Sequence, residues 1–231
     1  MAQIPRVLSI AGTDPTGGAG VQADLKAIAA AGGYGMSVTT ALVAQNTQGV
    51  REIHTPPQSF LRAQLDAVFD DVAVDAVKIG MLGDTETTHT VADYLAVRPV
   101  PVVVVDPVMV ATSGDRLLSA DAEAALRQLV ADHATVVTPN IPELAVLTDE
   151  PEPDSFDAAV ELGRRYAREA DVQVLVKGGH LSGERASNAL VAPDGSAHVA
   201  EVPRVATKNT HGTGCSLSSA LATRMALGSA T

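Results

Sequence analysis

The chain has 231 residues, of which 46% are apolar and 19 are glycine, a composition typical of a well-cored α/β protein rather than a disordered chain. It has no tryptophan and only 3% aromatic residues, so its core must be built from Val, Leu, Ile and Ala. A formal net charge of −11 disfavours binding to nucleic acids and to anionic membrane surfaces, because an acidic surface repels phosphate. A small phosphorylated ligand stays compatible, since a few local donors override the global field.

Short β-branched runs alternate with Ala-rich stretches of helical periodicity along the chain. The predicted strands are 7–10, 37–41, 76–79, 100–105, 135–137 and 172–176. The predicted helices are 21–31, 57–70, 85–97, 120–131 and 157–170. Strands that are apolar on both faces predict a parallel sheet covered by helices on each side, a three-layer α/β/α fold whose carboxyl strand ends share one edge.

The pattern changes in the last quarter of the chain. Residues 188–192 and 198–202 flank a Pro-Asp-Gly turn and predict an antiparallel hairpin at the edge of the sheet. A Gly-rich turn at 212–214 then precedes a last predicted helix, 215–227. No internal repeat or long linker divides the sequence, so we expect one domain, residues 1–231.

The single cysteine, Cys215, excludes an internal disulfide framework and indicates a reducing compartment, so we expect the cytoplasm. The apolar run at 7–11 is soon interrupted by Asp14 and Pro15. It is therefore neither a signal peptide nor a membrane span, which needs about 20 apolar residues.

The turn His211-Gly212-Thr213-Gly214-Cys215 is the first candidate site. Its glycines allow close approach of a ligand, and the free amides of the following helix attract an anion. In that first turn the pKa of the Cys215 thiol is expected to fall, which would let it accept a proton from a substrate hydroxyl. A glycine turn beside a structural cysteine explains the same residues equally well.

A second glycine cluster spans residues 12–20 and follows the first predicted strand. Neither the dinucleotide fingerprint nor the phosphate-loop spacing is present, so this loop is expected to wall a substrate pocket. Asp24, one turn into the next helix, is placed to accept hydrogen bonds from a substrate. The alternative is an ordinary surface acid near a helix N-terminus.

Polar residues also follow the later strands. Asp106 ends the strand 100–105 and can hold magnesium, although a turn-forming role also fits. Asn140 and Glu143 can reach one metal–phosphate site, or form a helix capping box. Lys177, before a glycine pair, supplies a charge for a nucleotide phosphate or is simply solvated. Together these segments predict a pocket suited to phosphoryl transfer.

Seven collinear motifs give the chain a specific resemblance to one family. They are GTDP (12–15), GGAG (17–20), AQNT (44–47), KIGML (78–82), TPN (138–140), KGGH (177–180) and HGTGC (211–215). This set resembles the hydroxymethylpyrimidine/phosphomethylpyrimidine kinases of the ribokinase-like superfamily. The resemblance implies ATP-dependent phosphorylation of 4-amino-5-hydroxymethyl-2-methylpyrimidine, and then of its monophosphate to the diphosphate, in thiamine biosynthesis.

The resemblance also implies roles for individual residues. Gln45 would hydrogen-bond the aminopyrimidine, and the remaining substrate-binding positions would be Gly12, Ala19, Asp24, Val43, Met81 and Val108. Lys177, Asn140 and Thr210 would serve ATP, with Asp106 and Glu143 serving Mg²⁺. Gly212, Thr213 and Gly214 would form the anion hole beside Cys215, which stands where many superfamily members carry an aspartate base.

Two alternatives stay open. Some cysteine-containing relatives act on pyridoxal, so a pyridoxal/pyridoxine kinase is the second reading, although Gln45 beside Met81 favours the pyrimidine. Family members usually continue past residue 231 through helices that close the nucleotide side, which leads us to expect a partly open adenine pocket here. A non-catalytic pyrimidine-binding protein is then the third reading. The resemblance further implies a homodimer.

Overall fold

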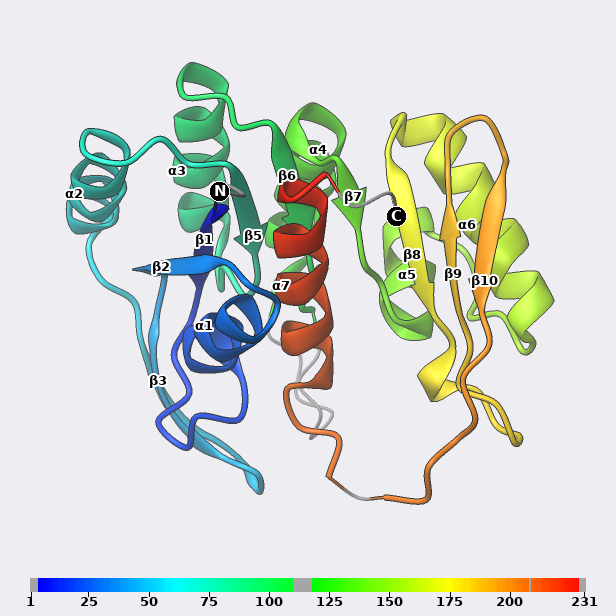
Figure 1. Ribbon diagram of the computed structural model, residues 1–231. Helices are drawn as coiled ribbons and strands as arrows, with labels where there is room; N and C mark the ends of the chain where they lie inside the picture. The colour runs from blue at the N-terminus through cyan, green and yellow to red at the C-terminus, as the bar shows by residue number, and fades with distance from the viewer. Residues whose placement is uncertain (1–3, 110–117, 208, 229–231) are drawn as a thin grey trace.

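The structure, a computed structural model, describes residues 4–109, 118–207 and 209–228. Its centre is an eight-stranded sheet in the order β10-β9-β8-β7-β6-β5-β1-β2 (Figure 1). Every pairing from β2 across to β8 is parallel, whereas β9 is antiparallel to both of its neighbours. The predicted, mostly parallel sheet with an antiparallel edge hairpin is therefore confirmed.

The predicted elements are all present, with ends that differ from the prediction by at most three residues. The strands of the sheet are β1 (Arg6–Ala11), β2 (Tyr34–Thr39), β5 (Ala76–Ile79), β6 (Val102–Val105), β7 (Val136–Val137), β8 (Gln173–Lys177), β9 (Asn188–Val191) and β10 (Ala197–Ala200). The predicted helices correspond to α1 (Gly20–Ala30), α2 (Gln58–Phe69), α3 (Thr85–Val97), α4 (Ala120–His133), α6 (Phe156–Ala170) and α7 (Thr213–Ala226).

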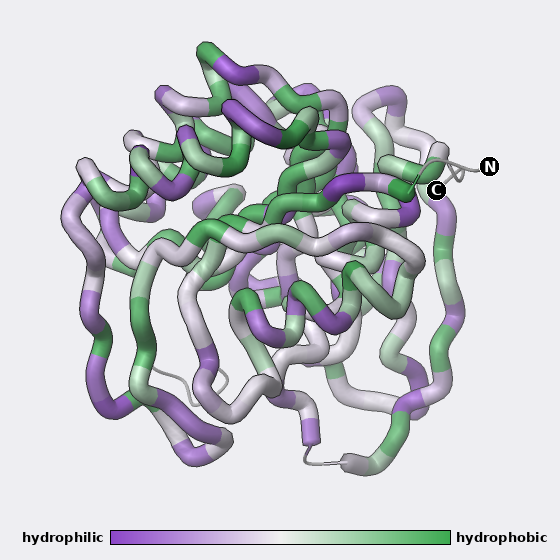
Figure 2. Tube along the Cα trace, turned by 60° about the vertical axis from the view of Figure 1, so that its left-hand side comes forward, coloured by the Kyte–Doolittle hydropathy of each residue, from purple (hydrophilic) through white to green (hydrophobic). Residues whose placement is uncertain are grey.

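Helices cover both faces of the sheet because alternate strand residues point to opposite sides. Val7, Ala76 and Val104 pack in one cluster with residues of α1 and α7. Their strand neighbours, such as Leu8 and Val77, pack in a larger cluster with α2 to α6. Figure 1 shows α1 and α7 on the near side of the sheet, and in Figure 2 the turns at the lower edge are largely hydrophilic.

The sequence prediction missed a small second sheet and one helix. Strands β3 (Leu42–Asn46) and β4 (Gly49–His54) form an antiparallel pair outside the main sheet. Most of their side chains are exposed, so the apolar alternation that marks a strand is weak here. Helix α5 (Ile141–Thr148) has eight residues, too few for a clear helical period.

The strand order places a crevice between β1 and β5. The chain passes from β1 outward to β2, and returns with β5 on the other side of β1. In an open α/β sheet, such a reversal opens a crevice at the carboxyl ends of the two strands, where ligands bind. Within the described residues, no helix is both long and apolar enough to cross a membrane.

Candidate active site

Three of the predicted substrate-binding residues meet at the carboxyl ends of β1 and β5. Gly12 directly follows β1, and Met81 comes two residues after β5. A Cβ atom at Gly12 would lie 2.6 Å from Met81 Cε and 3.4 Å from Val43 Cγ2, so a side chain there would have to displace the end of Met81. We call the region around Gly12, Val43, Gln45 and Met81 the β1–β5 crevice.

Strand β3 is tied to the first glycine loop by Thr13. The backbone amide of Val43 donates to Thr13 Oγ1 at 2.9 Å, and Gln45 Nε2 donates to the Thr13 carbonyl oxygen at 3.2 Å. Gln45 is half-buried, and its amide is held next to the residue that follows Gly12.

The two glycine loops, far apart in sequence, are in direct contact. Gly212 has a φ of 74°, and a Cβ atom there would overlap the carbonyl oxygen of Gly18. His211 Nε2 is hydrogen-bonded to Asp14 Oδ2 at 2.7 Å, and the same oxygen accepts from the Ala19 amide at 2.8 Å. The start of α7 is thus locked against the loop that borders the β1–β5 crevice.

Helix α7 begins at Thr213, two residues earlier than predicted, with Gly212 as its N-cap. No side chain caps this end, and the backbone amides of Gly214 and Cys215 have no acceptor among the described residues. Open amides and a helix dipole in this arrangement attract anions in general, so we call this helix end the anion site. Half-buried Cys215 lies in the same turn.

The expected fall in the thiol's pKa is wrong for this structure. Burial raises the pKa of Cys215, and the carboxylates of Asp106 and Asp24 raise it further, whereas the ammonium of Lys78 lowers it. Desolvation and two neighbouring negative charges outweigh the helix dipole on which the prediction relied.

Asp24 also differs from its expected exposure. Its carboxylate is fully buried and accepts hydrogen bonds from Lys78 Nζ at 2.9 Å on both oxygens. Ser9 Oγ and Ser219 Oγ donate to it at 2.6 and 2.8 Å. The sequence-based reading of Asp24 as a surface acid is therefore wrong, and its carboxylate faces Lys78 rather than an open pocket.

On the other side of the α7 N-terminus lies an acid–lysine cluster, which we define as Asp106, Glu143 and Lys177. Lys177 Nζ is 2.9 Å from Asp106 Oδ1 and 3.9 Å from Glu143 Oε2. A Cβ atom at Gly214 would lie 3.4 Å from that Nζ atom and 3.5 Å from Asp106 Oδ2. The first turn of α7 therefore borders both the β1–β5 crevice and the cluster.

The capping-box reading of Asn140 and Glu143 is confirmed. The Glu143 amide donates to Asn140 Oδ1 at 2.9 Å, and the Asn140 amide donates to Glu143 Oε2 at 2.8 Å. The glutamate nevertheless faces the cluster. Burial raises the pKa of Glu143 to about 7, with Lys177 opposing the rise and Asp106 adding to it.

The cluster fits the magnesium expected from the resemblance. No group of three or more His, Cys, Asp or Glu side chains in the described part of the chain is arranged to hold a metal. Two carboxylates are enough for Mg²⁺, which keeps several waters and binds substrate phosphates. Asp106 and Glu143 supply hard oxygen ligands, and a cation beside Glu143 would favour its charged form, which burial and then Asp106 disfavour.

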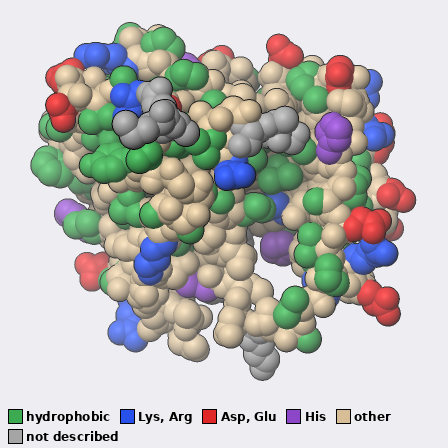
Figure 3. Space-filling view, in the orientation of Figure 1, with side chains coloured by type: hydrophobic (Ala, Val, Ile, Leu, Met, Phe, Trp, Pro, Cys, Tyr) green, Lys and Arg blue, Asp and Glu red, His purple; other side chains and the backbone are tan. Residues whose placement is uncertain are grey.

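The remaining predicted residues lie at the edges of the site. Half-buried Val108 follows Asp106, to whose carbonyl oxygen its amide donates at 2.8 Å. Thr210 is exposed, and its carbonyl oxygen accepts from Thr213 Oγ1 at 2.9 Å. In Figure 3 the surface is hollowed between α7 and the part of the molecule that holds β8 to β10.

Sequence reasoning did not assign a role to four residues that build the site. Asp14 and His211 link the glycine loops, a pairing that no local pattern indicates. Arg204 donates to the carbonyl oxygens of Gly179, Leu181, Gly183 and Arg185, so it holds the loop after Lys177 in place. Lys78 carried a usable signal, because a lone charge inside a buried strand implies a buried partner.

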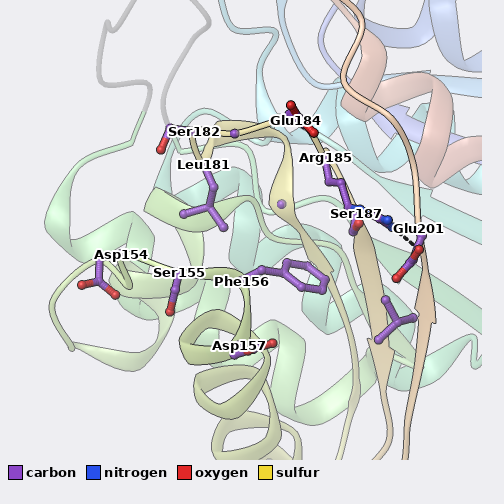
Figure 4. A pocket seen from close by; sticks show the side chains of 13 residues that line it. Asp154, Ser155, Phe156, Asp157, Leu181, Ser182, Glu184, Arg185, Ser187 and Glu201 are labelled. Carbon is purple, nitrogen blue, oxygen red and sulfur yellow. Dashed lines mark hydrogen bonds and ion pairs between the residues drawn. The ribbon is translucent and has the colours of Figure 1, made fainter.

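A separate hollow of about 640 Å³ lies beside the N-terminus of α6 (Figure 4). Phe156 and Leu181 project into it, and its rim carries the ion pair between Arg185 and Glu201. A Cβ atom at Gly178, the residue after Lys177, would lie 2.9 Å from Phe156 Cδ2. None of the predicted site residues lines this hollow.

The fold and the site together define a three-layer α/β protein in which the N-terminus of α7 lies between the β1–β5 crevice and the acid–lysine cluster. The family model described as phosphomethylpyrimidine kinase matches residues 14–231. A hydroxymethylpyrimidine/phosphomethylpyrimidine kinase of Escherichia coli is 49% identical over 93% of this chain and 80% of its own length. The chain therefore belongs to the phosphomethylpyrimidine kinase family.

Other similar proteins are longer or differ in name. The thiamine biosynthesis multifunctional protein ThiED of Corynebacterium efficiens is 65% identical over 97% of this chain, which spans only 30% of that relative. The structure of phosphomethylpyrimidine kinase from Clostridium difficile has a TM-score of 0.84 and 37% identity, covering 98% of this chain and 92% of its own. An ADP complex of Bacillus subtilis pyridoxal kinase has a TM-score of 0.88 and 32% identity, covering 98% and 85%.

Proposed function

We propose that the protein uses ATP to phosphorylate 4-amino-5-hydroxymethyl-2-methylpyrimidine, and then its monophosphate to the diphosphate, in thiamine biosynthesis. Membership of the phosphomethylpyrimidine kinase family supports this reaction. The observation that carries the proposal is the position of the first turn of α7. Gly212 abuts the loop of the β1–β5 crevice, while Gly214 abuts Lys177 and Asp106. A phosphoryl group moving between two substrates needs an anion site of this kind between them.

Each side of the site has a distinct task in this reaction. The pyrimidine would lie in the β1–β5 crevice, with Gln45 hydrogen-bonding its ring and with Gly12, Val43 and Met81 around it. The hydroxymethyl oxygen would attack the γ-phosphorus of ATP as the bond to the β,γ-bridging oxygen breaks, and ADP would leave. Cys215, in its thiolate form, would accept the hydroxyl proton, while the amides of Gly214 and Cys215 hold the charge on the moving phosphoryl group.

The acid–lysine cluster would serve the nucleotide. The ammonium of Lys177, freed from part of its pairing with Asp106, would face the phosphates of ATP. Mg²⁺ held by Asp106 and Glu143 would supply positive charge beside those phosphates and offset a carboxylate that raises the pKa of Cys215. Asn140 would keep its structural task, which is to hold Glu143 in place through the capping box.

Mass spectrometry of the reaction mixture tests the proposed activity. The protein, ATP, Mg²⁺ and hydroxymethylpyrimidine should yield the monophosphate and then the diphosphate. A variant with Asp106→Asn should yield far less of both. Tight binding of the pyrimidine by calorimetry with no ATP consumed would contradict the proposed kinase, and would instead support a non-catalytic binding protein.

A pyridoxal kinase activity is the second candidate, because a pyridoxal kinase is among the similar structures. The carbonyl oxygen and amide of Gln45 match the adjacent ring nitrogen and amino group of an aminopyrimidine, which pyridoxal lacks. We therefore expect hydroxymethylpyrimidine to win a direct competition for limiting enzyme. Faster phosphorylation of pyridoxal in the same mixture would reverse the assignment.

We infer further that the protein acts as a homodimer in the cytoplasm. The large exposed apolar side chains Tyr34, Leu42 and Phe60 lie on β2, β3 and α2, and Figure 3 shows apolar groups gathered on this side of the molecule. A reducing compartment would keep the Cys215 thiol available as a proton acceptor. Sedimentation should give the mass of a dimer, and Phe60→Glu should shift it toward the monomer.

A further inference from the structure

Among the described residues, Lys78 has the largest side chain that is fully buried. It stands in β5 between Val77 and Ile79, both of which are core residues. Burying an ammonium group in such a strand is strongly unfavourable unless the charge is paired and hydrogen-bonded. Core packing therefore does not explain a lysine here, since an apolar residue would fill the strand at lower cost.

The partner of Lys78 is Asp24, and the pair is held from four elements of the fold. Lys78 Nζ donates to both oxygens of the Asp24 carboxylate at 2.9 Å. Ser9 of β1 and Ser219 of α7 donate their hydroxyl groups to the same carboxylate. The carboxylate thus accepts four hydrogen bonds inside the protein, which fixes the position of the lysine charge.

This pair lies one helical turn below the anion site. Ser219 is four residues after Cys215 on α7, and Asp24 is four residues after Gly20 on α1, so each lies on the same helix face as the earlier residue. A Cβ atom at Gly80 would lie 2.8 Å from Lys78 Nζ. The ammonium therefore reaches toward the carboxyl end of β5, the edge at which the crevice opens.

The charge of Lys78 acts on the groups of the site. Burial alone would lower the pKa of Lys78, but Asp24, Cys215 and Asp106 together raise it above that of an ordinary lysine, so the side chain stays charged. The same charge lowers the pKa of Asp106 and opposes the rise in the pKa of Cys215. Solvent does not screen a charge in this position.

We propose that Lys78 is a positioning residue of the transfer reaction, a fixed positive charge clamped by Asp24 beneath the open amides of α7. It would hold Ser219 and the first turn of α7 in place through Asp24, and it would support negative charge on Cys215 and on the moving phosphoryl group. This inference rests on the proposed kinase function. It also gives Asp24 the task of a counter-ion rather than that of a substrate ligand.

The first test is Lys78→Met, which keeps the length of the side chain and removes its charge. We expect kcat to fall about tenfold or more, with the KM values for ATP and for the pyrimidine nearly unchanged, because the charge favours the transition state over the bound substrates. Cys215 is the only cysteine of the chain, so the rate of alkylation by iodoacetamide reports on this thiol alone. That rate should fall severalfold at constant pH as the thiolate loses its nearby cation.

Two further variants separate this effect from a loss of folding. Lys78→Met alone leaves the Asp24 charge buried, whereas Lys78→Met combined with Asp24→Asn removes both charges and avoids that penalty. Lys78 affects the pKa of the Cys215 thiol more strongly than Asp24 does. The double variant should therefore still be alkylated more slowly than the wild type. Arg6→Met is the matched control, because Arg6 pairs with Asp75 at the amino-terminal ends of β1 and β5, away from the site, and its loss should leave kcat and alkylation unchanged.

Thermal unfolding of each variant identifies the folded ones, and the conclusion is drawn from those. A folded variant without the lysine charge that retains the wild-type kcat and alkylation rate would overturn the inference. Equal losses in the Arg6→Met control would also overturn it, because they would mark a general effect on stability. If the wild type makes no phosphorylated product, the proposed function fails, while the alkylation series still measures the effect of Lys78 on Cys215.

Discussion

The two sides of the α7 N-terminus are built in different ways. On the β1–β5 side, two backbone segments are in close contact, and Gly212 and Gly18 leave no space for a Cβ atom. On the β8 side, charged groups face one another, with Lys177 between Asp106 and Glu143. Gly179 on that side has no atom within 4 Å of an added Cβ.

For the proposed kinase, this difference predicts that the two substrates are recognised by different physical means. A closely packed loop beside the crevice suits a flat ring whose shape does not vary, because close packing rejects wrong shapes. A cluster with excess negative charge suits a nucleotide that arrives with its metal, because the cation completes the charge balance. We therefore expect the proposed pyrimidine side to be preformed and the proposed nucleotide side to be completed by the incoming cation.

The largest expected effect is on the closed side. Gly212→Ala should destabilise the protein by about 3 kcal/mol or more and abolish most turnover, because the residue has a positive φ and the new methyl group overlaps the Gly18 carbonyl oxygen. Urea unfolding and a kinase assay measure the two effects. Gly179→Ala is the matched change on the open side and should alter stability by less than about 0.5 kcal/mol. Similar losses in both variants would remove the contrast between the two regions.

Cys215→Ala is expected to lower kcat by about a hundredfold, the usual contribution of a general base, with little change in substrate affinity. The substitution removes a single sulfur atom, so the variant should stay folded. Steady-state kinetics and pyrimidine titration check the two halves of this expectation. If kcat changes less than threefold, Cys215 is structural and another group accepts the proton.

Gln45→Ala should weaken pyrimidine binding by about 1–3 kcal/mol, because a polar group of the buried ring would lose its partner. The effect should appear in the affinity for pyrimidine by calorimetry, with the affinity for ATP unchanged. Gln48→Ala, in the exposed turn between β3 and β4, provides the control and should bind as the wild type does. A loss of ATP affinity alone would place Gln45 on the wrong side of the site.

The smallest expected effect concerns Glu143 and pH. Its pKa is raised to about 7 in the folded protein, from 4.5 when unperturbed, so the folded state holds its proton more tightly than the unfolded chain. The resulting stabilisation is complete below pH 4.5 and is lost as the pH rises through about 7. Glu143→Gln should therefore gain about 1–2 kcal/mol of stability relative to the wild type over this interval.

Urea unfolding of both proteins at the two ends of the interval measures that change. Glutamine preserves the capping-box acceptor, so the comparison isolates the charge. A constant difference between the two proteins across the pH series would show that the charge of Glu143 carries no such penalty.

Much of the fold was predictable because its signals are local. The apolar strands such as β5 and β6 and the helices between them were found from periodicity, and the hairpin of β9 and β10 from its Pro-Asp-Gly turn. Strands β3 and β4 were not predicted, because apolar residues such as Leu42 and Ile53 are exposed and the sequence there has no clear alternation of apolar and polar residues. The two strands pair with each other, and Val43 joins them to the first glycine loop through Thr13.

The sequence by itself determined the layered α/β fold, the strand ends that carry polar residues and the motifs that indicate the family. Tertiary structure alone decided which groups face one another: Asp24 with Lys78, Asp14 with His211, and Asp106 with Lys177. It also decided the sign of the pKa shift of Cys215, because burial and through-space charges depend on residues distant in the chain. Local patterns specify elements, whereas electrostatics at a site depends on distances that exist only once the chain is folded.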